Sequence, residues 1–278
     1  MPHTRLTTTT PFDGRGLMKY FAGHAVPGIE SGDEEHYRRN LRESDGSLSK
    51  LEVILDGIDG ILASRNGSTL SPSQMRDVRK LFDLNADSVA IDAHLSSDPV
   101  LAEVVAANPG IRLPGSLDAH EQLLRTMIGQ QISVPAARTT IARLARELDG
   151  TGLFPTAKQF AENGLDVLRG PAARIAAVHG VAVALCSGTL ALPPDLDQPK
   201  LTNDLVAMPG VGPWTAGYVA MRVLGAPDVL LSSDLVLLKG AAKLGLPATP
   251  RGIADYARRW APYRSYAGLH LWRVAQQP

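Results

Sequence analysis

The sequence predicts a small α+β domain at the N-terminus, residues 1–112, followed by an all-α bundle, residues 113–278. Three observations predict this division. The first part contains β-branched stretches interrupted by Gly, Asn and Asp, which is typical of short strands and turns. The second part repeats apolar residues at helical spacing, with few β-branched alternations. Between them, the segment NPGIRLPGS, residues 108–116, has the proline and glycine content of a linker.

Both strands and helices are predicted in the first part. The stretches LMKYFAGHAVPGIE (17–30) and SKLEVILDGIDGILASRNG (49–67) are apolar and β-branched and predict short strands with turns. In SPSQMRDVRKLF (71–82), the cap residue Ser71 precedes apolar residues at helical spacing, so we expect a helix there. DPVLAEVVAANPG (98–110) predicts another short helix.

Helix signals dominate the second part. DAHEQLLRTMIGQQ (118–131) opens with Asp118 and Glu121 in the spacing of a capping box. SVPAARTTIARLARELDG (133–150) begins with a serine cap and an early proline and ends at a glycine. Further helices are predicted within residues 166–188, 234–245 and 249–276, and two more flank a glycine-rich turn near residue 210.

The composition is that of an ordinary globular protein, and it limits the classes of function. The chain has 278 residues, of which 44% are apolar and 20% are charged. Its one cysteine, Cys186, excludes disulfides within the chain, cysteine-based zinc sites and iron–sulfur clusters. The histidines lack metal-binding spacing, and no glycine-rich nucleotide loop or Gly-x-Ser-x-Gly motif is present. We therefore expect no cofactor.

Charge and targeting signals in the sequence limit the location and the partners that we expect for this protein. The sequence has no apolar run long enough to span a membrane and no secretory signal at residues 1–16. We expect a cytoplasmic monomer with no membrane partner. A net charge of zero argues weakly against a nucleic-acid partner. However, basic residues outnumber acidic residues from residue 117 onward, which permits DNA binding.

The stretch LVAMPGVGPWTAGYVAMRV (205–223) interrupts a helical pattern at residues 209–212 and restarts it at once. Its two glycines give a tight turn with unhindered backbone N–H groups. The restarted helix adds its own free N–H groups and the positive end of its dipole. Such a combination binds anions, of which phosphate is the usual one. The simpler alternative is a helix–helix connection whose glycines only permit a sharp turn.

An acid and several aromatic residues follow this turn. With Ser232 or Ser233 as the cap, Asp234 falls in the first turn of a helix, where its carboxylate lies near the helix N-terminus. The simpler alternative is an acid that only caps. Trp214 and Tyr218 are four residues apart and share a helix face. They belong either to the core or to a cleft in which a flipped base stacks.

Four runs in this order resemble the helix–hairpin–helix (HhH-GPD) DNA glycosylases: LRTMIGQQISVPAA, LVAMPGVGPWTAGYVAMRVLG, DVLLSSDLVLLKGAAK and RWAPYRSYAGLHLW. Among these glycosylases, the sequence is most similar to the 3-methyladenine-DNA glycosylase II (AlkA) type. The stretches MKYFAGHAVPGIE and RKLFDLNADSVAI resemble the small α+β domain of that type. The resemblance therefore implies an α+β N-terminal domain followed by an all-α helix–hairpin–helix glycosylase bundle.

The resemblance implies a role for each matching residue. Asp234 corresponds to the essential acid of the family. The residues that line the base pocket are Trp214, Tyr218, Trp272 and Tyr20. The residues on a DNA phosphate are Pro209, Gly210, Val211, Gly212 and Thr215, with Na⁺ or K⁺ held by hairpin backbone and no metal held by side chains. The wedge that fills the gap of the flipped base falls on Gln131, or on its neighbour Ile132.

The function implied is a monofunctional DNA N-glycosylase of base excision repair. It would flip alkylated purines, such as 3-methyladenine or 7-methylguanine, out of double-stranded DNA and hydrolyse the N-glycosyl bond, leaving an abasic site. Bifunctional members carry a lysine two residues after the last hairpin glycine. That position is Trp214 here, and residues 201–238 contain no lysine, so no AP-lyase activity is expected.

Two features leave alternatives open. Arg273 stands where relatives have an aromatic residue beside Trp272, which alters the pocket rim and disfavours cationic bases. A non-catalytic helix–hairpin–helix module that binds damaged DNA is one alternative function. A glycosylase for a different lesion is the other, because one fold supports many pockets.

Overall fold

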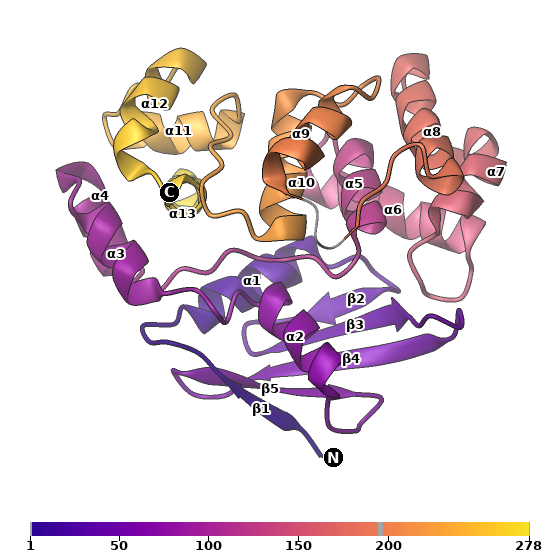
Figure 1. Ribbon diagram of the computed structural model, residues 1–278, viewed down its shortest axis with the longest axis horizontal. Helices are drawn as coiled ribbons and strands as arrows, with labels where there is room; N and C mark the ends of the chain where they lie inside the picture. The colour runs from indigo at the N-terminus through magenta and orange to yellow at the C-terminus, as the bar shows by residue number, and fades with distance from the viewer. Residues whose placement is uncertain (1, 194–196, 278) are drawn as a thin grey trace.

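The N-terminal part of the computed structural model is an antiparallel sheet with helices packed against it (Figure 1). The structure describes residues 2–193 and 197–277. The strand order is β1-β5-β4-β3-β2. The strands are β1 (Thr4–Thr7), β2 (Glu30–Gly32), β3 (His36–Arg42), β4 (Leu48–Leu55) and β5 (Gly60–Arg65). Helices α1 (Gly14–His24) and α2 (Pro72–Leu81) pack with the sheet.

Strands β4 and β5 and helix α2 confirm their predictions. Alternate side chains of the strands enter the core, among them Leu51 and Val53 on β4. The capping box of α2 is complete: the Ser71 hydroxyl accepts the Gln74 N–H, and the Gln74 side chain accepts the Ser71 N–H. The serine that marked this helix in the sequence therefore fixes its first turn.

Helix α1 replaces the strand predicted within residues 17–30, where only Glu30 enters a strand. Asp13 caps the helix by accepting the Gly16 N–H at 3.0 Å. Leu17 and Phe21 are one turn apart and are both buried against the sheet. The prediction was wrong because this spacing is helical and does not alternate.

The remaining helices complete the fold. They are α3 (Ser88–Ser96), α4 (Pro99–Ala107), α5 (Ala119–Ile128), α6 (Val134–Leu148), α7 (Ala157–Val167), α8 (Ala172–Ser187), α9 (Gln198–Val206), α10 (Pro213–Leu224), α11 (Leu235–Lys243), α12 (Pro250–Tyr256) and α13 (Arg264–Gln276). The caps predicted at Asp118 and Ser133 are confirmed. The capping box at Asp118 is only half formed, because the Glu121 carboxylate binds Arg39 and Arg125 instead.

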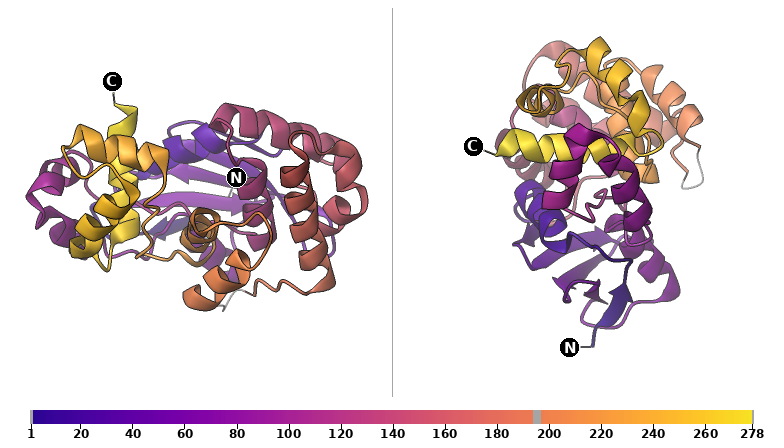
Figure 2. Two further views of the ribbon diagram at one scale, coloured as in Figure 1. Left: turned by 90° about the horizontal axis from the view of Figure 1, so that it is seen from above. Right: turned by 90° about the vertical axis from the view of Figure 1, so that its left-hand side faces the viewer.

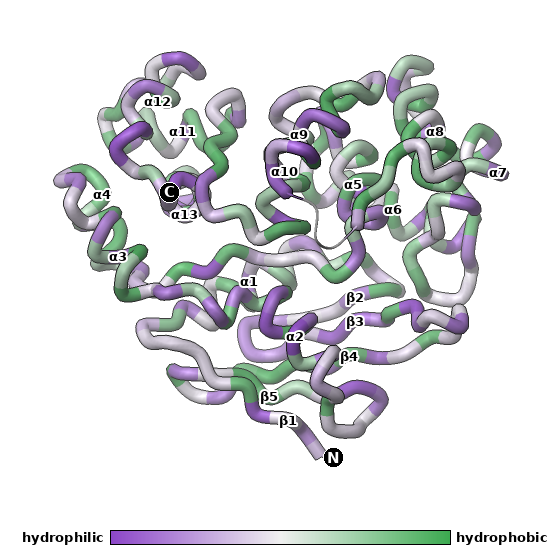
Figure 3. Tube along the Cα trace, in the orientation of Figure 1, coloured by the Kyte–Doolittle hydropathy of each residue, from purple (hydrophilic) through white to green (hydrophobic). Residues whose placement is uncertain are grey.

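These helices form two groups with separate cores. Helices α5 to α10 enclose one core, which includes Leu123 and Phe160. Helices α3 and α4 pack with α11, α12 and α13 around a second core that includes Leu95 and Trp260. The right view of Figure 2 shows α3 and α4 beside α13, and Figure 3 shows the hydrophobic run along α8. The predicted boundary after residue 112 therefore assigns α3 and α4 to the first part, although both helices pack in a core of the second part.

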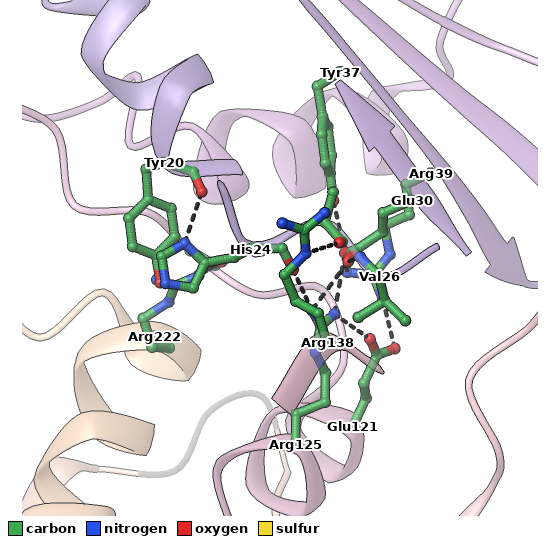
Figure 4. Close-up of polar contacts among 12 residues, drawn as sticks. Tyr20, His24, Val26, Glu30, Tyr37, Arg39, Glu121, Arg125, Arg138 and Arg222 are labelled. Carbon is green, nitrogen blue, oxygen red and sulfur yellow. Dashed lines mark hydrogen bonds and ion pairs between the residues drawn. The ribbon is translucent and has the colours of Figure 1, made fainter. Parts of the chain in front are cut away.

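A buried cluster of four charges joins the sheet to helix α5. We call Glu30, Arg39, Glu121 and Arg125 the interface cluster (Figure 4). Arg125 donates to the two carboxylate oxygens of Glu30 at 3.1 and 3.0 Å and to Glu121 at 2.9 Å. Arg39 donates to both glutamates. Burial opposes ionisation, but the two arginines lower the pKa of Glu30 to about 2.

Candidate active site

The predicted pocket residues line one cavity of about 910 Å³. Their positions in the fold are Tyr20 on α1, Trp214 and Tyr218 on α10, Asp234 before α11, and Trp272 on α13. The cavity therefore lies where the sheet meets both groups of helices. Its volume falls within the range of roughly 300–1,000 Å³ that is usual for small-ligand sites.

Asp234 is the N-cap residue of α11 and is held by three donors. One carboxylate oxygen, Oδ1, accepts the Leu237 N–H at 2.8 Å and the Trp272 indole N–H at 3.0 Å. The other oxygen, Oδ2, accepts the Trp214 indole N–H at 2.9 Å. Asp234 itself caps the helix, so the prediction that Ser232 or Ser233 does so was wrong. A half-buried carboxylate with fixed orientation faces the cavity.

Asp98 shows that this bonding pattern alone does not identify a catalytic acid. It caps α4 by accepting the Val100 N–H at 3.0 Å, and it also accepts the Trp260 indole N–H at 2.8 Å. Asp98 is only 5% exposed and does not line the cavity. Asp234 therefore differs from Asp98 in its position on the cavity wall and not in its capping bond.

The aromatic residues form a continuous wall of this cavity. Trp214 and Tyr218 stack with ring centroids 5.2 Å apart and planes inclined by 5°. Trp272 lies 6.3 Å from Tyr218 and is tilted by 58°. The hydroxyl of Tyr20 is 2.9 Å from that of Tyr218, so a residue of the sheet domain completes the wall. Such a wall can stack against a planar base.

The turn between α9 and α10 presents glycine backbone to solvent. Pro209, Gly210 and Gly212 are exposed, and Gly210 has a φ of 79°. Among the hydrogen bonds between described residues, none uses the backbone N–H of Gly210 or Gly212. Val211 differs from its neighbours, because its side chain is buried and its N–H donates to Met208. Thr215 is also buried, and its hydroxyl accepts from Gln130 at 3.0 Å.

The two hairpin glycines allow a matched test of phosphate binding. A Cβ at Gly212 meets no atom within 4 Å, whereas a Cβ at Gly210 would lie 2.4 Å from the Cβ of Ala177. We expect Gly212→Ala to fold with wild-type stability and to bind duplex DNA about tenfold more weakly, because its methyl group occupies the approach of a phosphate. Gly210→Ala should lose about 1–3 kcal/mol of unfolding free energy. Fluorescence anisotropy and urea unfolding measure the two effects; unchanged DNA affinity of Gly212→Ala would contradict phosphate binding here.

The turn between α5 and α6 contains the two wedge candidates. Gln131 is exposed and has a φ of 60°, which places it at the left-handed tip of the turn. Ile132 is partly buried and lines the cavity. The neighbouring Gln130 donates to the Gly210 carbonyl at 3.3 Å and to the Thr215 hydroxyl. This side chain connects the wedge turn to the hairpin.

Arg273 is held by one contact with the sheet domain and one with the end of α4. Its guanidinium forms an ion pair with Asp13 at 2.5 Å and donates to Asn108 at 3.0 Å. Its positive charge is therefore compensated, although the residue still lies on the cavity rim. The expected effect of Arg273 on cationic bases is reduced by this pairing.

Three residues at the site were not identified from the sequence: His24 and Arg222, which line the cavity, and Gln130, which bonds to the hairpin. Gln130 and His24 carried no signal, because their roles depend on contacts with residues distant in sequence. His24 stacks on Tyr20 with ring centroids 4.0 Å apart (Figure 4), and burial lowers its pKa to about 4. Arg222 did carry a signal, since it follows Trp214 and Tyr218 at the same four-residue spacing on α10.

Within residues 2–193 and 197–277, no group of three or more His, Cys, Asp or Glu side chains is placed to hold a metal ion. No helix in the same ranges is long and apolar enough to cross a membrane.

Comparisons with known proteins identify relatives of one family. Residues 3–118 match the model of the AlkA N-terminal domain. The chain is 37% identical to "Probable bifunctional transcriptional activator/DNA repair enzyme AlkA" of Mycobacterium tuberculosis, over 99% of this chain and 57% of that relative. It is 34% identical to "DNA-3-methyladenine glycosylase 2" of Escherichia coli, over 94% of each protein. The chain thus spans little more than half of the first relative and nearly all of the second.

A solved structure shares the whole fold. The 3-methyladenine DNA-glycosylase from Archaeoglobus fulgidus superposes with a TM-score of 0.82 over 98% of both chains, at 18% sequence identity. This similarity shows that both the sheet domain and the helical part keep their arrangement. The predicted α+β domain followed by a helical bundle is therefore confirmed.

Proposed function

Because this chain belongs to the DNA-3-methyladenine glycosylase 2 (AlkA) family, we propose that it hydrolyses the N-glycosyl bond of alkylated purines in double-stranded DNA. The E. coli relative carries 3-methyladenine in its name, and purines methylated at N3 or N7 are the substrate class that we extend to this chain. The observation that carries the proposal is Asp234, a carboxylate fixed by two indole N–H groups on the wall of an aromatic cavity.

The geometry supports a mechanism in which the base leaves before water adds. The damaged nucleotide is extruded into the cavity at a cost of a few kcal/mol, which is lowest for a poorly paired base. Faces of Trp214 and Trp272 favour a cationic base by roughly 0.5–2 kcal/mol each. The Asp234 carboxylate stabilises the oxocarbenium-like sugar and orients the attacking water. The product is an abasic site.

We infer that the enzyme is monofunctional. A lyase needs an amine that forms a Schiff base with the sugar. The position that would supply it is Trp214, whose indole is engaged with Asp234. Lys19 is the lysine that lines the cavity; its side chain is 60% exposed and forms an ion pair with Glu34 at 3.3 Å. Because no other lysine is among the described residues that line the cavity, we infer that no amine lies beside the carboxylate.

DNA contact is assigned to the hairpin and to the α5–α6 turn. The free N–H groups of Gly210 and Gly212 suit a backbone phosphate, and such contacts are independent of base sequence. Residues 207–212 contain no acidic side chain, so a Na⁺ or K⁺ ion at the hairpin would have to be held by main-chain carbonyls. Of the two wedge candidates, Ile132 offers the apolar side chain that can replace a base in the stack.

Base release from duplex DNA treated with dimethylsulfate tests the proposal. We expect the full chain to release 3-methyladenine and 7-methylguanine, which chromatography separates. The DNA strand should stay intact until alkali cleaves the abasic sites, and borohydride should trap no covalent complex. DNA binding without release of any base would instead establish a non-catalytic module. Release confined to DNA that carries another lesion would redirect the substrate assignment.

A further inference from the structure

Arg222 places a buried positive charge on the wall of the cavity. The residue is 7% exposed and lines the cavity together with Tyr20 and Tyr218. Its guanidinium donates to the Tyr20 hydroxyl and, at 3.1 Å, to the Gly115 carbonyl. It lies 4.7 Å from the ring centroid of Tyr20, below that ring in Figure 4. The side chain is therefore held in one orientation by both domains.

Within the part of the chain that the structure describes, no carboxylate forms an ion pair with this charge. Arg222 takes part in none of the ion pairs among residues 2–193 and 197–277, in contrast to Arg273 and to the arginines of the interface cluster. Its Nε atom is buried without a hydrogen-bond partner. His24, which stacks on the Tyr20 ring, is neutral at physiological pH because burial lowers its pKa to about 4. An uncompensated buried cation acts strongly on any charge that enters the same cavity.

Helix α10 separates this cation from the catalytic acid along one face. Trp214, Tyr218 and Arg222 follow each other at intervals of one helical turn, so Arg222 lies about 12 Å along the helix from Trp214. Asp234 accepts a hydrogen bond from Trp214, the first of these three residues, and Arg222 is the third. Along this helix face, the carboxylate therefore lies at one end and the guanidinium at the other.

We propose that Arg222 is a specificity-determining residue that favours bases leaving the sugar as anions over bases that enter the cavity as cations. This inference rests on the proposed glycosylase activity and deepens it: methylated purine cations remain substrates, and Arg222 sets how well neutral bases compete with them. The chemistry is heterolysis of the bond between C1′ and the base nitrogen, in which both bonding electrons pass to the base.

The two charge classes respond to Arg222 in opposite ways. A neutral base, such as a 6-oxopurine, becomes an anion while the sugar becomes a cation; water then adds to C1′, and its proton ends on the base. Arg222 stabilises this developing negative charge, while Asp234 stabilises the sugar. An N-methylated purine cation leaves as a neutral molecule, so Arg222 opposes its entry, and this cost is only cancelled as the positive charge passes from the base to the sugar. Tyr20 remains protonated, because burial raises the pKa of its hydroxyl well above the usual value.

Single-turnover release from two matched duplexes tests this inference, one carrying hypoxanthine and one carrying 7-methylguanine. In Arg222→Gln, which keeps a donor but loses the charge, we expect the ratio of hypoxanthine to 7-methylguanine rates to fall about tenfold or more. In Arg222→Lys, which keeps the charge, the ratio should stay within about threefold of wild type. Circular dichroism confirms folding of both variants, and inhibition by free hypoxanthine and free 7-methylguanine gives the same comparison without catalysis.

The outcomes separate this inference from the proposed function. If Arg222 only supports the structure, both rates fall together in Arg222→Gln and the ratio does not move, which overturns the inference. Release of 7-methylguanine but no hypoxanthine by wild type would also overturn it while leaving the glycosylase proposal intact. Release of neither base by wild type would refute the activity on which the inference rests.

Discussion

Replacing Asp234 with asparagine is expected to lower the rate of base release from methylated DNA at least 100-fold while leaving DNA binding within about twofold of wild type. The amide removes the negative charge that stabilises the sugar cation. It also places an N–H₂ group against one of the two indole N–H donors, at Trp214 or Trp272. Single-turnover kinetics measure the first effect and fluorescence anisotropy measures the second.

Asp98→Asn is the matched control for this experiment. Asp98 has the same local chemistry, a helix N-cap that accepts a tryptophan N–H, but it lies outside the cavity. We expect this variant to be less stable by about 1–3 kcal/mol and to release bases at the wild-type rate once folded. Equal rates for Asp234→Asn and wild type would show that Asp234 only caps α11, as Asp98 caps α4.

Replacing Glu30 with glutamine is expected to lower the free energy of unfolding by about 3–5 kcal/mol, because it breaks the buried interface cluster from within. The side chain of Glu30 is 5% exposed and accepts from Arg125, Arg39, the Tyr37 hydroxyl and the Val26 N–H. Glutamine leaves the excess positive charge of two buried arginines opposite one glutamate. Urea unfolding at neutral pH measures the loss.

The pH dependence of stability provides a second measurement of the same group. The pKa of Glu30 is about 2 in the folded chain, against a reference value of 4.5. Its contribution is therefore complete above about pH 4.5 and is lost as the pH falls toward 2, since the unfolded chain binds the proton first. This contribution is worth roughly 3 kcal/mol, and Glu30→Gln should lack it.

A surface pair serves as the control for Glu30. Lys200 and Asp204 form an ion pair at 2.7 Å on α9 with side chains 62% and 36% exposed. Asp204→Asn should change the free energy of unfolding by less than about 0.5 kcal/mol at any pH. An equally small change in Glu30→Gln would mean that the interface cluster does not stabilise the junction between the sheet and α5.

Local signals in the sequence predicted much of the fold. Ser71 and Ser133 marked helix starts because a cap acts within its own first turn. Pro209–Gly212 marked the hairpin because Gly210 has a positive φ, which glycine adopts more readily than other residues. Helix α1 was missed because β-branched and apolar residues near Val26 and Ile29 outweighed the helical spacing of the preceding residues. The partnership of α3 and α4 with the C-terminal helices has no local signal at all.

The sequence also predicted several of the residues that line the candidate site. The motif order located Asp234 and its aromatic neighbours, which the structure brings to one cavity. What the sequence could not provide are bonds between distant residues, such as the one between Arg222 and Tyr20, which are 202 positions apart. The compensation of Arg273 by Asp13 is of the same kind. The partners of the charged residues in the cavity are therefore defined only by the folded structure.

The packing of α3 and α4 against the C-terminal helices has a consequence for synthesis on the ribosome. The strands of the sheet are all made by residue 65, so their pairing is local and can begin early. Helices α3 and α4 emerge soon afterwards, but their buried faces await partners such as Trp260, whose indole meets Asp98 across 162 positions. Until residues 235–276 are made, the nascent chain thus carries an uncovered apolar surface, to which holding chaperones can bind and from which aggregation of an interrupted chain would start.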